Sequence, residues 1–169
     1  MTRYRRHDTA DGWREAVYSE CETYRYSLTA TWDPGKRRLL YVMLNPSKAT
    51  ELANDPTIER CERRARQLDY GAFRVVNLFA LRETSPTRLK AAKAPNGPDN
   101  VRHISDAIGW TDHILAAWGV HGAHNGQNTD ALKILRNGGK PLFHLGLTKH
   151  GHPRHPLYIS YETRPTSWK

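Results

Sequence analysis

The chain has 169 residues, with 26 Lys or Arg against 17 Asp or Glu, so its formal net charge is +9 before its nine histidines are counted. This length suits a single domain, and a hydrophobic content of 38% can supply its core, which excludes a disordered protein. No apolar run approaches the roughly 20 residues that cross a bilayer, and residues 1–15 are too polar for a secretory signal, so we expect a cytoplasmic protein with no membrane contact.

The first half of the chain predicts three strands and a helix. Alternating apolar residues over 24–32 are typical of a strand with one face on the core. The continuous apolar runs at 39–44 and 72–79 are typical of strands covered on both faces. Between these runs, Asp55 followed by Pro56 is a good helix start, because Asp accepts free backbone N–H groups and Pro suits the first helical position.

The second half predicts two more buried strands, at 113–118 and 141–145, and two longer helices, at 99–109 and 129–137. A short helical stretch ends near Ala92. Strands that alternate with helices at these spacings predict parallel pairing through right-handed crossovers. We therefore predict an α/β fold, a three-layer α/β/α sandwich with a mainly parallel central sheet.

The whole chain, residues 1–169, is expected to form one domain. Within it, residues 1–22 make up an N-terminal segment, residues 23–160 the α/β core and residues 161–169 a tail. No internal repeat, linker or low-complexity tract divides the chain. The oligomeric state stays open at this stage.

Polar side chains directly follow three of the predicted strands. Asn45-Pro46-Ser47 follows the first buried run, Asn77 falls near the end of the next, and the loop 148–158 follows the last. Because ligands in open α/β sheets bind beyond the carboxyl ends of the strands, we expect these segments to converge on a site. Taken singly, an asparagine at the end of a strand serves as often to satisfy the backbone of a turn.

These segments resemble motifs of the uracil-DNA glycosylase superfamily. Residues 42–47, Val-Met-Leu-Asn-Pro-Ser, are similar to its strand-and-loop motif, especially the Gly-Ile-Asn-Pro-Gly form of the thymine/mismatch branch. Residues 75–78, Val-Val-Asn-Leu, are similar to the strand whose final Asn reads the base, and residues 155–157, His-Pro-Leu, are similar to the late His-Pro motif. The whole pattern more closely resembles an uncharacterised bacterial and phage family known only as a domain of unknown function: MLNPS, DPT, VVNLFALR, AAWG and GHPRHPLY.

The resemblance implies cleavage of an N-glycosidic bond in nucleic acid, in DNA rather than RNA, or in a nucleotide. Such cleavage builds negative charge on the leaving base, so the site needs an oriented water and a hydrogen-bond donor. By this analogy Asn45 orients the water, Asn77 binds the edge of the base and His155 stabilises the departing base. The other expected substrate-binding residues are Pro46, Ser47, Thr57 and Arg154.

The chain departs from the superfamily pattern in several places. Leu157 stands where a small serine usually follows the His-Pro pair, and no aromatic shelf is evident after the first motif. Trp118 closes a buried strand and is expected to fill core rather than to stack on a base. His152 begins a second His-Pro pair and competes with His155 for the catalytic role, for which we favour His155. Residues 157–159 are expected to begin a final strand, with insertion into a base step as the alternative.

Asp55 and the basic residues each have a functional and a structural interpretation. A carboxylate beside the first motif can activate water where an amide does not, whereas Asp at a helix start is commonly an N-cap, and one residue can do both. The candidates for contacting nucleic-acid phosphates are Arg60, Arg63, Arg64 and Lys149. Arginines on a helix commonly pair instead with acidic neighbours in solvent.

Four histidines fall in the last core strand and the loop after it, and they raise the question of a metal ion: His144, His150, His152 and His155. Their spacing lacks the fixed helical geometry of metalloprotease motifs, so we expect no metal and no other cofactor. Cys21 and Cys61 show no CxxC spacing and are expected to be ordinary buried thiols.

The leading prediction is a uracil-DNA-glycosylase-like hydrolase that acts on a base in nucleic acid. Two alternatives stay open, a non-catalytic module that recognises a modified base and a metal-dependent nuclease or phosphohydrolase built on the histidine loop. The positive charge agrees with a nucleic-acid partner, although a basic surface with no specific partner explains the composition equally well.

Overall fold

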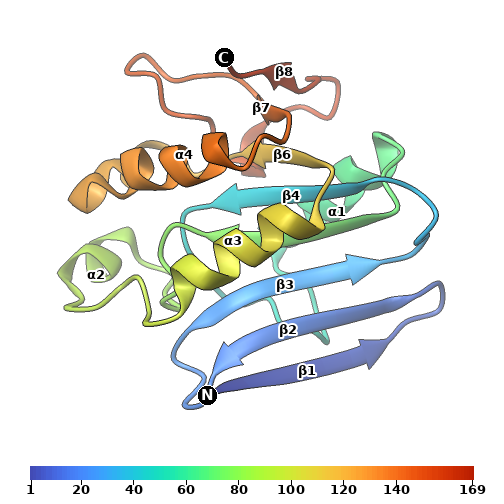
Figure 1. Cartoon of the computed structure of the whole chain (residues 1–169), viewed down its shortest axis with the longest axis horizontal. Coiled ribbons are helices and arrows are strands. Elements are labelled where there is room, and N and C mark those ends of the chain that lie inside the picture. The colour runs from blue at the N-terminus through green and yellow to red at the C-terminus, as the bar shows by residue number, and fades with distance from the viewer.

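The computed structural model describes all residues, 1–169, and contains one eight-stranded sheet with helices on both faces (Figure 1). The strands are β1 (Thr2–Asp8), β2 (Trp13–Ser19), β3 (Arg25–Thr31), β4 (Arg38–Met43), β5 (Ala72–Asn77), β6 (His113–Ala116), β7 (Leu142–His144) and β8 (Thr166–Ser167). The α-helices are α1 (Pro56–Gln67), α2 (Pro86–Ala91), α3 (Asn100–Trp110) and α4 (Gln127–Asn137), and the 3-10 helices are η1 (Val120–Gly126) and η2 (Pro156–Tyr158). None of the helices is long and apolar enough to cross a lipid bilayer.

The four strands at the centre of the sheet run parallel, in the order β5-β4-β6-β7. Their connections carry the helices: α1 joins β4 to β5, α2 and α3 lie between β5 and β6, and α4 lies between β6 and β7. The carboxyl ends of these strands therefore meet at one edge of the sheet, on the left in Figure 1, where α2 also lies. This is the edge at which α/β proteins build their sites.

Helix α1 packs on one face of the sheet. Its N-cap is Asp55, whose Oδ1 accepts the backbone N–H of Ile58 at 2.9 Å, as a cap at this helix start requires. Ile58 and Cys61 are buried and join a core cluster with Tyr41 of β4 and Phe73 of β5. The predicted helix, its predicted cap and the predicted burial of Cys61 are confirmed.

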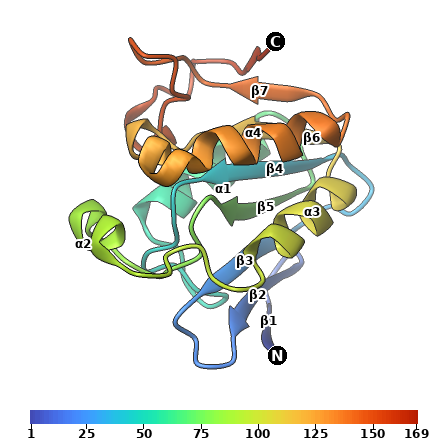
Figure 2. The same ribbon diagram turned by 60° about the vertical axis from the view of Figure 1, so that its left-hand side comes forward.

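Helices α3 and α4 lie on the opposite face, in front of the sheet in Figures 1 and 2. Ile104 of α3 and Leu135 of α4 pack in a second core cluster with Leu40 and Val42 of β4. Because successive side chains of a strand point to opposite faces, Leu40 and Val42 face this cluster while Tyr41 faces the other. The continuous apolar run of β4 is explained by this double burial.

The α/β class is confirmed, but the sheet is not mainly parallel. Three of its seven strand pairings are parallel and four are antiparallel. The N-terminal segment 1–22 was expected outside the core, yet it forms β1 and β2, which extend the sheet beyond β3. Charged residues make these strands hard to predict from the sequence. Strand β1 is an exposed edge strand, so most of its side chains are polar. In β2, Arg14 is buried, and it forms an ion pair with Glu62 at 3.0 Å.

Two smaller predictions are also wrong. Residues 157–159 do not begin a strand, because Leu157 and Tyr158 belong to η2 and Ile159 is its C-cap. The final strand, β8, comes later, at Thr166–Ser167. Cys21 is exposed rather than buried. Hydrogen bonds with Thr23, which has the larger effect, and with Ser19 lower the pKa of the Cys21 thiol to about 7.

Candidate functional site

A pocket of about 370 Å³ opens at the carboxyl ends of β4 and β5. This volume falls in the range of small-ligand sites, about 300–1,000 Å³. The pocket brings together predicted residues from four separate segments: Asn45, Pro46, Ser47, Asp55, Thr57, Asn77 and His155. The ends of the strands therefore converge as the sequence indicates.

Backbone hydrogen bonds hold the ends of β4 and β5 side by side. The N–H of Leu78 donates to the carbonyl of Met43 at 2.9 Å, and the N–H of Phe79 donates to the carbonyl of Leu44 at 3.0 Å. In the parallel register Met43 lies opposite Asn77. The two predicted asparagines thus enter the pocket from neighbouring strand ends.

Asn45 is anchored to the fold through its side-chain nitrogen. Its Nδ2 donates to the carbonyls of Pro46 at 3.1 Å, Leu81 at 3.2 Å and Glu83 at 2.6 Å. These bonds tie the end of β4 to the loop that follows β5. The side-chain oxygen of Asn45 accepts no hydrogen bond from the protein, so it can accept one from water or a ligand.

Asn77 lies deeper than Asn45, and its side-chain nitrogen is free where that of Asn45 is bonded. Its residue is 1% exposed, and its Nδ2 has no hydrogen-bond partner in the protein. Its backbone carbonyl is held by Nδ2 of Asn100 at 2.8 Å, which fixes the backbone at the end of β5. A buried amide nitrogen without a partner is unusual in folded proteins, and here it belongs to a residue that lines a pocket.

His155 supplies a second hydrogen-bond donor. Its Nδ1 accepts the backbone N–H of Leu157 at 3.3 Å, so in the neutral imidazole the proton is on Nε2. Burial lowers the pKa of His155, and the negative charge of Asp55 partly opposes this effect. The neutral form, with Nε2–H as donor, is therefore favoured around neutral pH.

A backbone contact places the loop of His155 against the end of β6. The N–H of Gly119 donates to the carbonyl of Pro153 at 2.8 Å. Gly119 has φ 72° and ψ −170°, a conformation that only glycine adopts readily, and its Cα side faces His155, since an added Cβ would lie 3.7 Å from the Cβ of His155. The glycine after Trp118 thus allows the late loop to reach the pocket.

Two arginines of α1 hold the same loop from its other side. Nε of Arg60 donates to the carbonyl of Pro156 at 3.3 Å, and its guanidinium also donates to the carbonyl of Ile159. Arg60 and Arg63 lie over the ring of Tyr161, with guanidinium carbons 4.4 Å and 5.6 Å from the ring centroid. Arg60, predicted to contact nucleic acid, therefore makes its contacts with the chain itself, while Arg63 is exposed.

The prediction that Arg64 contacts nucleic-acid phosphates is wrong. Arg64 is buried, at 1% exposed, and was expected on a surface that contacts phosphates. Its guanidinium donates to the carbonyls of Ile159 at 3.1 Å, Ser160 at 3.2 Å and Thr163 at 3.0 Å. The residues after η2 fold over α1, and this covering removes Arg64 from solvent.

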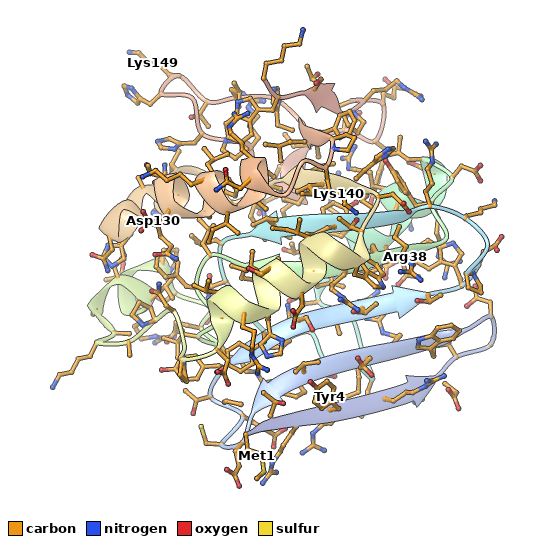
Figure 3. All side chains as sticks on the ribbon, in the orientation of Figure 1. Met1, Tyr4, Arg38, Asp130, Lys140 and Lys149 are labelled. Atoms are coloured by element: carbon orange, nitrogen blue, oxygen red, sulfur yellow. The ribbon has the colours of Figure 1, made fainter.

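Three other predicted residues lie outside the pocket. His152 does not line it, so His155 is the histidine of the two His-Pro pairs that does. Arg154 is exposed and lines a surface hollow of about 340 Å³ that shares His155 with the pocket. Lys149 is exposed on the loop after β7, and Figure 3 shows its side chain directed away from the sheet.

Two carboxylates line the pocket, and backbone groups engage both of them. Asp55 accepts the N–H of Ile58 on Oδ1 and the N–H of Ala49 on Oδ2 at 3.2 Å. Glu83, which was not predicted, accepts the N–H groups of Thr84 and Ser85 on Oε2 and Nε of Arg88 on Oε1. The bond from Ser85, followed by that from Arg88, lowers the pKa of Glu83. The structural interpretation of Asp55 as an N-cap is confirmed, and neither carboxylate is free of backbone partners.

Arg25 and Trp118 also line the pocket, and neither position was predicted from the sequence pattern. Arg25 starts β3 and is 2% exposed, hidden in the alternation of the first predicted strand. Trp118 is 1% exposed, so its predicted place in the core is confirmed, while its Nε1 has no partner. The residues that line the pocket therefore include donors without protein partners, on Asn77 and Trp118, which suit acceptor atoms of a ligand.

The histidine loop does not assemble a metal site. No three His, Cys, Asp or Glu side chains are grouped so that they can hold an ion. His144 instead uses Nδ1 to accept the N–H of Gly146 at 2.9 Å, and its ring packs edge-on against Trp168. The ring of His144 thus takes part in local packing and a turn hydrogen bond.

A comparison with protein-family models supplies the family. A model described as Protein of unknown function (DUF1643) matches residues 25–157, which is most of the chain and spans every segment of the pocket from β3 to the loop of His155. No curated protein and no solved structure matches the chain. The predicted likeness to a family of unknown function is therefore confirmed, and the chain belongs to the DUF1643 family.

Proposed function

We propose that this protein binds a nucleobase in the pocket and cleaves its N-glycosidic bond, with the parallel centre of the sheet acting as a uracil-DNA-glycosylase-like scaffold and DNA as the favoured nucleic acid. The observation that carries this proposal is the Nδ2 group of Asn77, a buried donor that lines the pocket without a partner. Leaving such a donor unsatisfied costs about 1–3 kcal/mol, and an acceptor atom on a bound base removes that cost.

The three predicted residues divide the chemistry among them. The free side-chain oxygen of Asn45 accepts a hydrogen bond from water and orients it toward C1′ of the sugar. As the water oxygen bonds to C1′, the bond from C1′ to the base nitrogen breaks and its electron pair leaves with the base. The Nε2–H of His155 and the Nδ2–H of Asn77 donate to the base as it gains negative charge, and the proton lost by water ends on the base or in solvent.

The same geometry favours a second candidate, recognition of a base without turnover. Both pocket carboxylates, Asp55 and Glu83, accept two backbone N–H groups each. Such bonds stabilise the ionised carboxylate, and at Glu83 they lower the pKa and make the group a weaker base. Asn45 is an amide and removes no proton, so hydrolysis relies on positioning and electrostatics and is expected to be slow.

Base release from labelled oligonucleotides tests the proposal. Single- and double-stranded substrates carrying uracil, thymine mismatches, hypoxanthine or modified pyrimidines are incubated with the protein in EDTA, and free base and abasic sites are measured. We expect release from at least one substrate, and a loss of about 10²-fold in His155→Gln, because one donor to a developing anion is worth about that much. His152→Gln is the matched control, since His152 lies outside the pocket.

The outcomes separate the candidates. Equal release by His155→Gln and the wild type would overturn the assigned role of His155. Tight binding of one substrate with no release over long incubation would replace hydrolysis by recognition. Strand cleavage that requires an added divalent cation would instead support the metal-dependent nuclease.

A further inference from the structure

Arg25 is a buried cation with few partners in the protein. Its Nη1 donates to the carbonyl of Ala49 at 2.9 Å, while its Nε is buried without any partner. No carboxylate lies within ion-pair distance of its guanidinium, and Asp55, which also lines the pocket, acts on its charge only from farther away. Burial lowers the pKa of Arg25 to about 10, so the group still carries its charge near neutral pH. A buried charge that is not paired is strongly unfavourable, and this one lines the pocket.

The other buried arginines, Arg14 and Arg64, also have an Nε without a partner, but each has more protein acceptors than Arg25. Arg14 pairs with Glu62 at 3.0 Å and also donates to the side chain of Asn54 at 2.5 Å. Arg64 donates to three backbone carbonyls beyond η2. Neither residue lines the pocket. Packing alone therefore does not explain why Arg25 has a single protein acceptor.

The beginning of α1 adds further donors beside Arg25. Thr57 is the second residue of this 12-residue helix and lines the pocket, and its backbone N–H donates to no acceptor in the protein. The first N–H groups of a helix are free in this way, and the helix dipole places partial positive charge at this end. The hydroxyls of Thr57 and Ser47 can donate as well. The pocket carboxylates, Asp55 and Glu83, are engaged by backbone N–H groups rather than by Arg25.

We infer that Arg25, with Thr57 and Ser47, binds the phosphate group of a nucleotide whose base lies against Asn77. A guanidinium, hydroxyls and a helix N-terminus are the groups that hold phosphate in proteins, and an anion here supplies the missing partner of Arg25. The pocket volume of about 370 Å³ is that of a small-ligand site rather than of a macromolecular groove. The inference rests on the proposed function for the base, but it requires no bond cleavage.

Calorimetric titration tests this phosphate site with named probes. Thymidine, deoxyuridine and deoxyinosine are compared with their 5′-monophosphates and with dinucleotides that carry a single phosphodiester. We expect at least one phosphate-bearing form to bind the wild type about tenfold or more tightly than its nucleoside, a difference of about 1.4 kcal/mol. A larger gain with the monophosphate identifies a free nucleotide as the source of the phosphate, and a larger gain with the dinucleotide identifies a nucleic-acid strand.

Arg25→Met removes the charge and keeps the length of the side chain. We expect it to abolish the preference for phosphate while nucleoside affinity stays within about twofold of the wild type. We expect it to fold, because removing an unpaired buried charge offsets the loss of the hydrogen bond to the Ala49 carbonyl. Arg14→Met is the matched control, a buried arginine outside the pocket whose loss leaves the preference unchanged. If Arg25→Met does not fold, Arg25→Lys decides the matter by a partial loss of the preference.

The failures of the two proposals are distinguishable. Equal wild-type affinity for nucleosides and their phosphate forms overturns the phosphate site, and so does a full preference retained by Arg25→Met or, where that variant does not fold, by Arg25→Lys. An Arg25-dependent preference without base release from any substrate leaves the phosphate site standing and removes the hydrolytic function. Base release with no phosphate preference removes the phosphate site alone.

Discussion

The ends of β4 and β5 lie side by side, and each places an asparagine at the pocket. At the end of β4, the side-chain nitrogen of Asn45 donates to three backbone carbonyls. At the end of β5, the side-chain nitrogen of Asn77 donates to nothing, although its residue is 1% exposed. The same residue type near the ends of two neighbouring strands therefore builds the pocket at one strand end and leaves a donor for a ligand at the other.

This difference has a physical consequence for how the site is maintained. A satisfied amide stabilises the fold with or without a ligand, whereas an unsatisfied buried amide destabilises the empty protein and is compensated only on binding. We expect substitutions at the end of β4 to act on stability and substitutions at the end of β5 to act on binding. Substitutions at four residues test this expectation.

Asn45→Ala is expected to have the largest effect. It removes the donor for the carbonyls of Leu81 and Glu83, and each buried acceptor left without a partner costs about 1–3 kcal/mol. Urea unfolding should show a loss of that order or more in the free energy of unfolding, together with loss of base release. An unchanged free energy of unfolding would show that the two carbonyls bind water instead. It would contradict a stabilising role for the Asn45 side chain.

Asn77→Leu should behave in the opposite way. The apolar side chain removes an unsatisfied donor at similar volume, so the free energy of unfolding should stay within about 1 kcal/mol of the wild type or rise. Base release, or base binding where no release occurs, should fall about 10²-fold. Asn77→Asp is the control that keeps the shape and exchanges the donor for an acceptor. A strongly destabilised Asn77→Leu with normal base binding would contradict the division.

Replacing His155 is expected to have a smaller effect, on how the free energy of unfolding depends on pH. Burial lowers the pKa of His155 in the folded protein relative to about 6.5 in the unfolded chain. Below that pH the unfolded state binds more protons, so this residue makes the free energy of unfolding fall as the pH drops from about 6.5 toward the lowered pKa. Urea unfolding at several pH values should show a steeper acid loss in the wild type than in His155→Gln, with His152→Gln following the wild type. Identical slopes in wild type and His155→Gln would contradict burial of this imidazole.

Lys149→Ala should have the smallest effect. Lys149 is exposed on a loop away from the pocket, so any phosphate contact it makes is screened by salt. Binding of a labelled oligonucleotide should weaken by less than about tenfold, with the slope against salt concentration reduced by about one, and base release at saturating substrate should be unchanged. A fall in saturated base release would place Lys149 closer to the chemistry than the structure has it.

The parallel centre of the fold and the strand-end residues were predictable because each rests on a local signal. The apolar runs of β4 and β5, the Asp55 cap and the turn-forming Asn45-Pro46 pair follow from neighbouring residues. Strands β1 and β2 were not predictable in the same way, since β1 is exposed and polar throughout most of its length. Their pairing is recognisable only once β3 is present as a template.

The missed residues of the pocket depend on contacts between distant segments. Arg25 looks like a polar residue in an alternating strand, and its unpaired burial arises only when the loop of Ala49 and the start of α1 close over it. Arg64 looks like a surface residue, and it is buried only because the carbonyls of 159–163 fold onto α1. Charge near the strand ends therefore has to be interpreted after the fold is known.

One measurement tests the division between the two strand ends most directly. The side-chain amide signals of Asn45 and Asn77 are followed by nitrogen-edited NMR in ¹⁵N-labelled protein as uracil, thymine or hypoxanthine is added, with Asn45→Ala and Asn77→Asp assigning the two signals. We expect the Asn77 amide protons to shift and become protected from exchange on binding, while those of Asn45 are protected before any base is added. Saturation with every base that leaves the Asn77 amide unchanged, or that shifts only Asn45, would contradict this expectation.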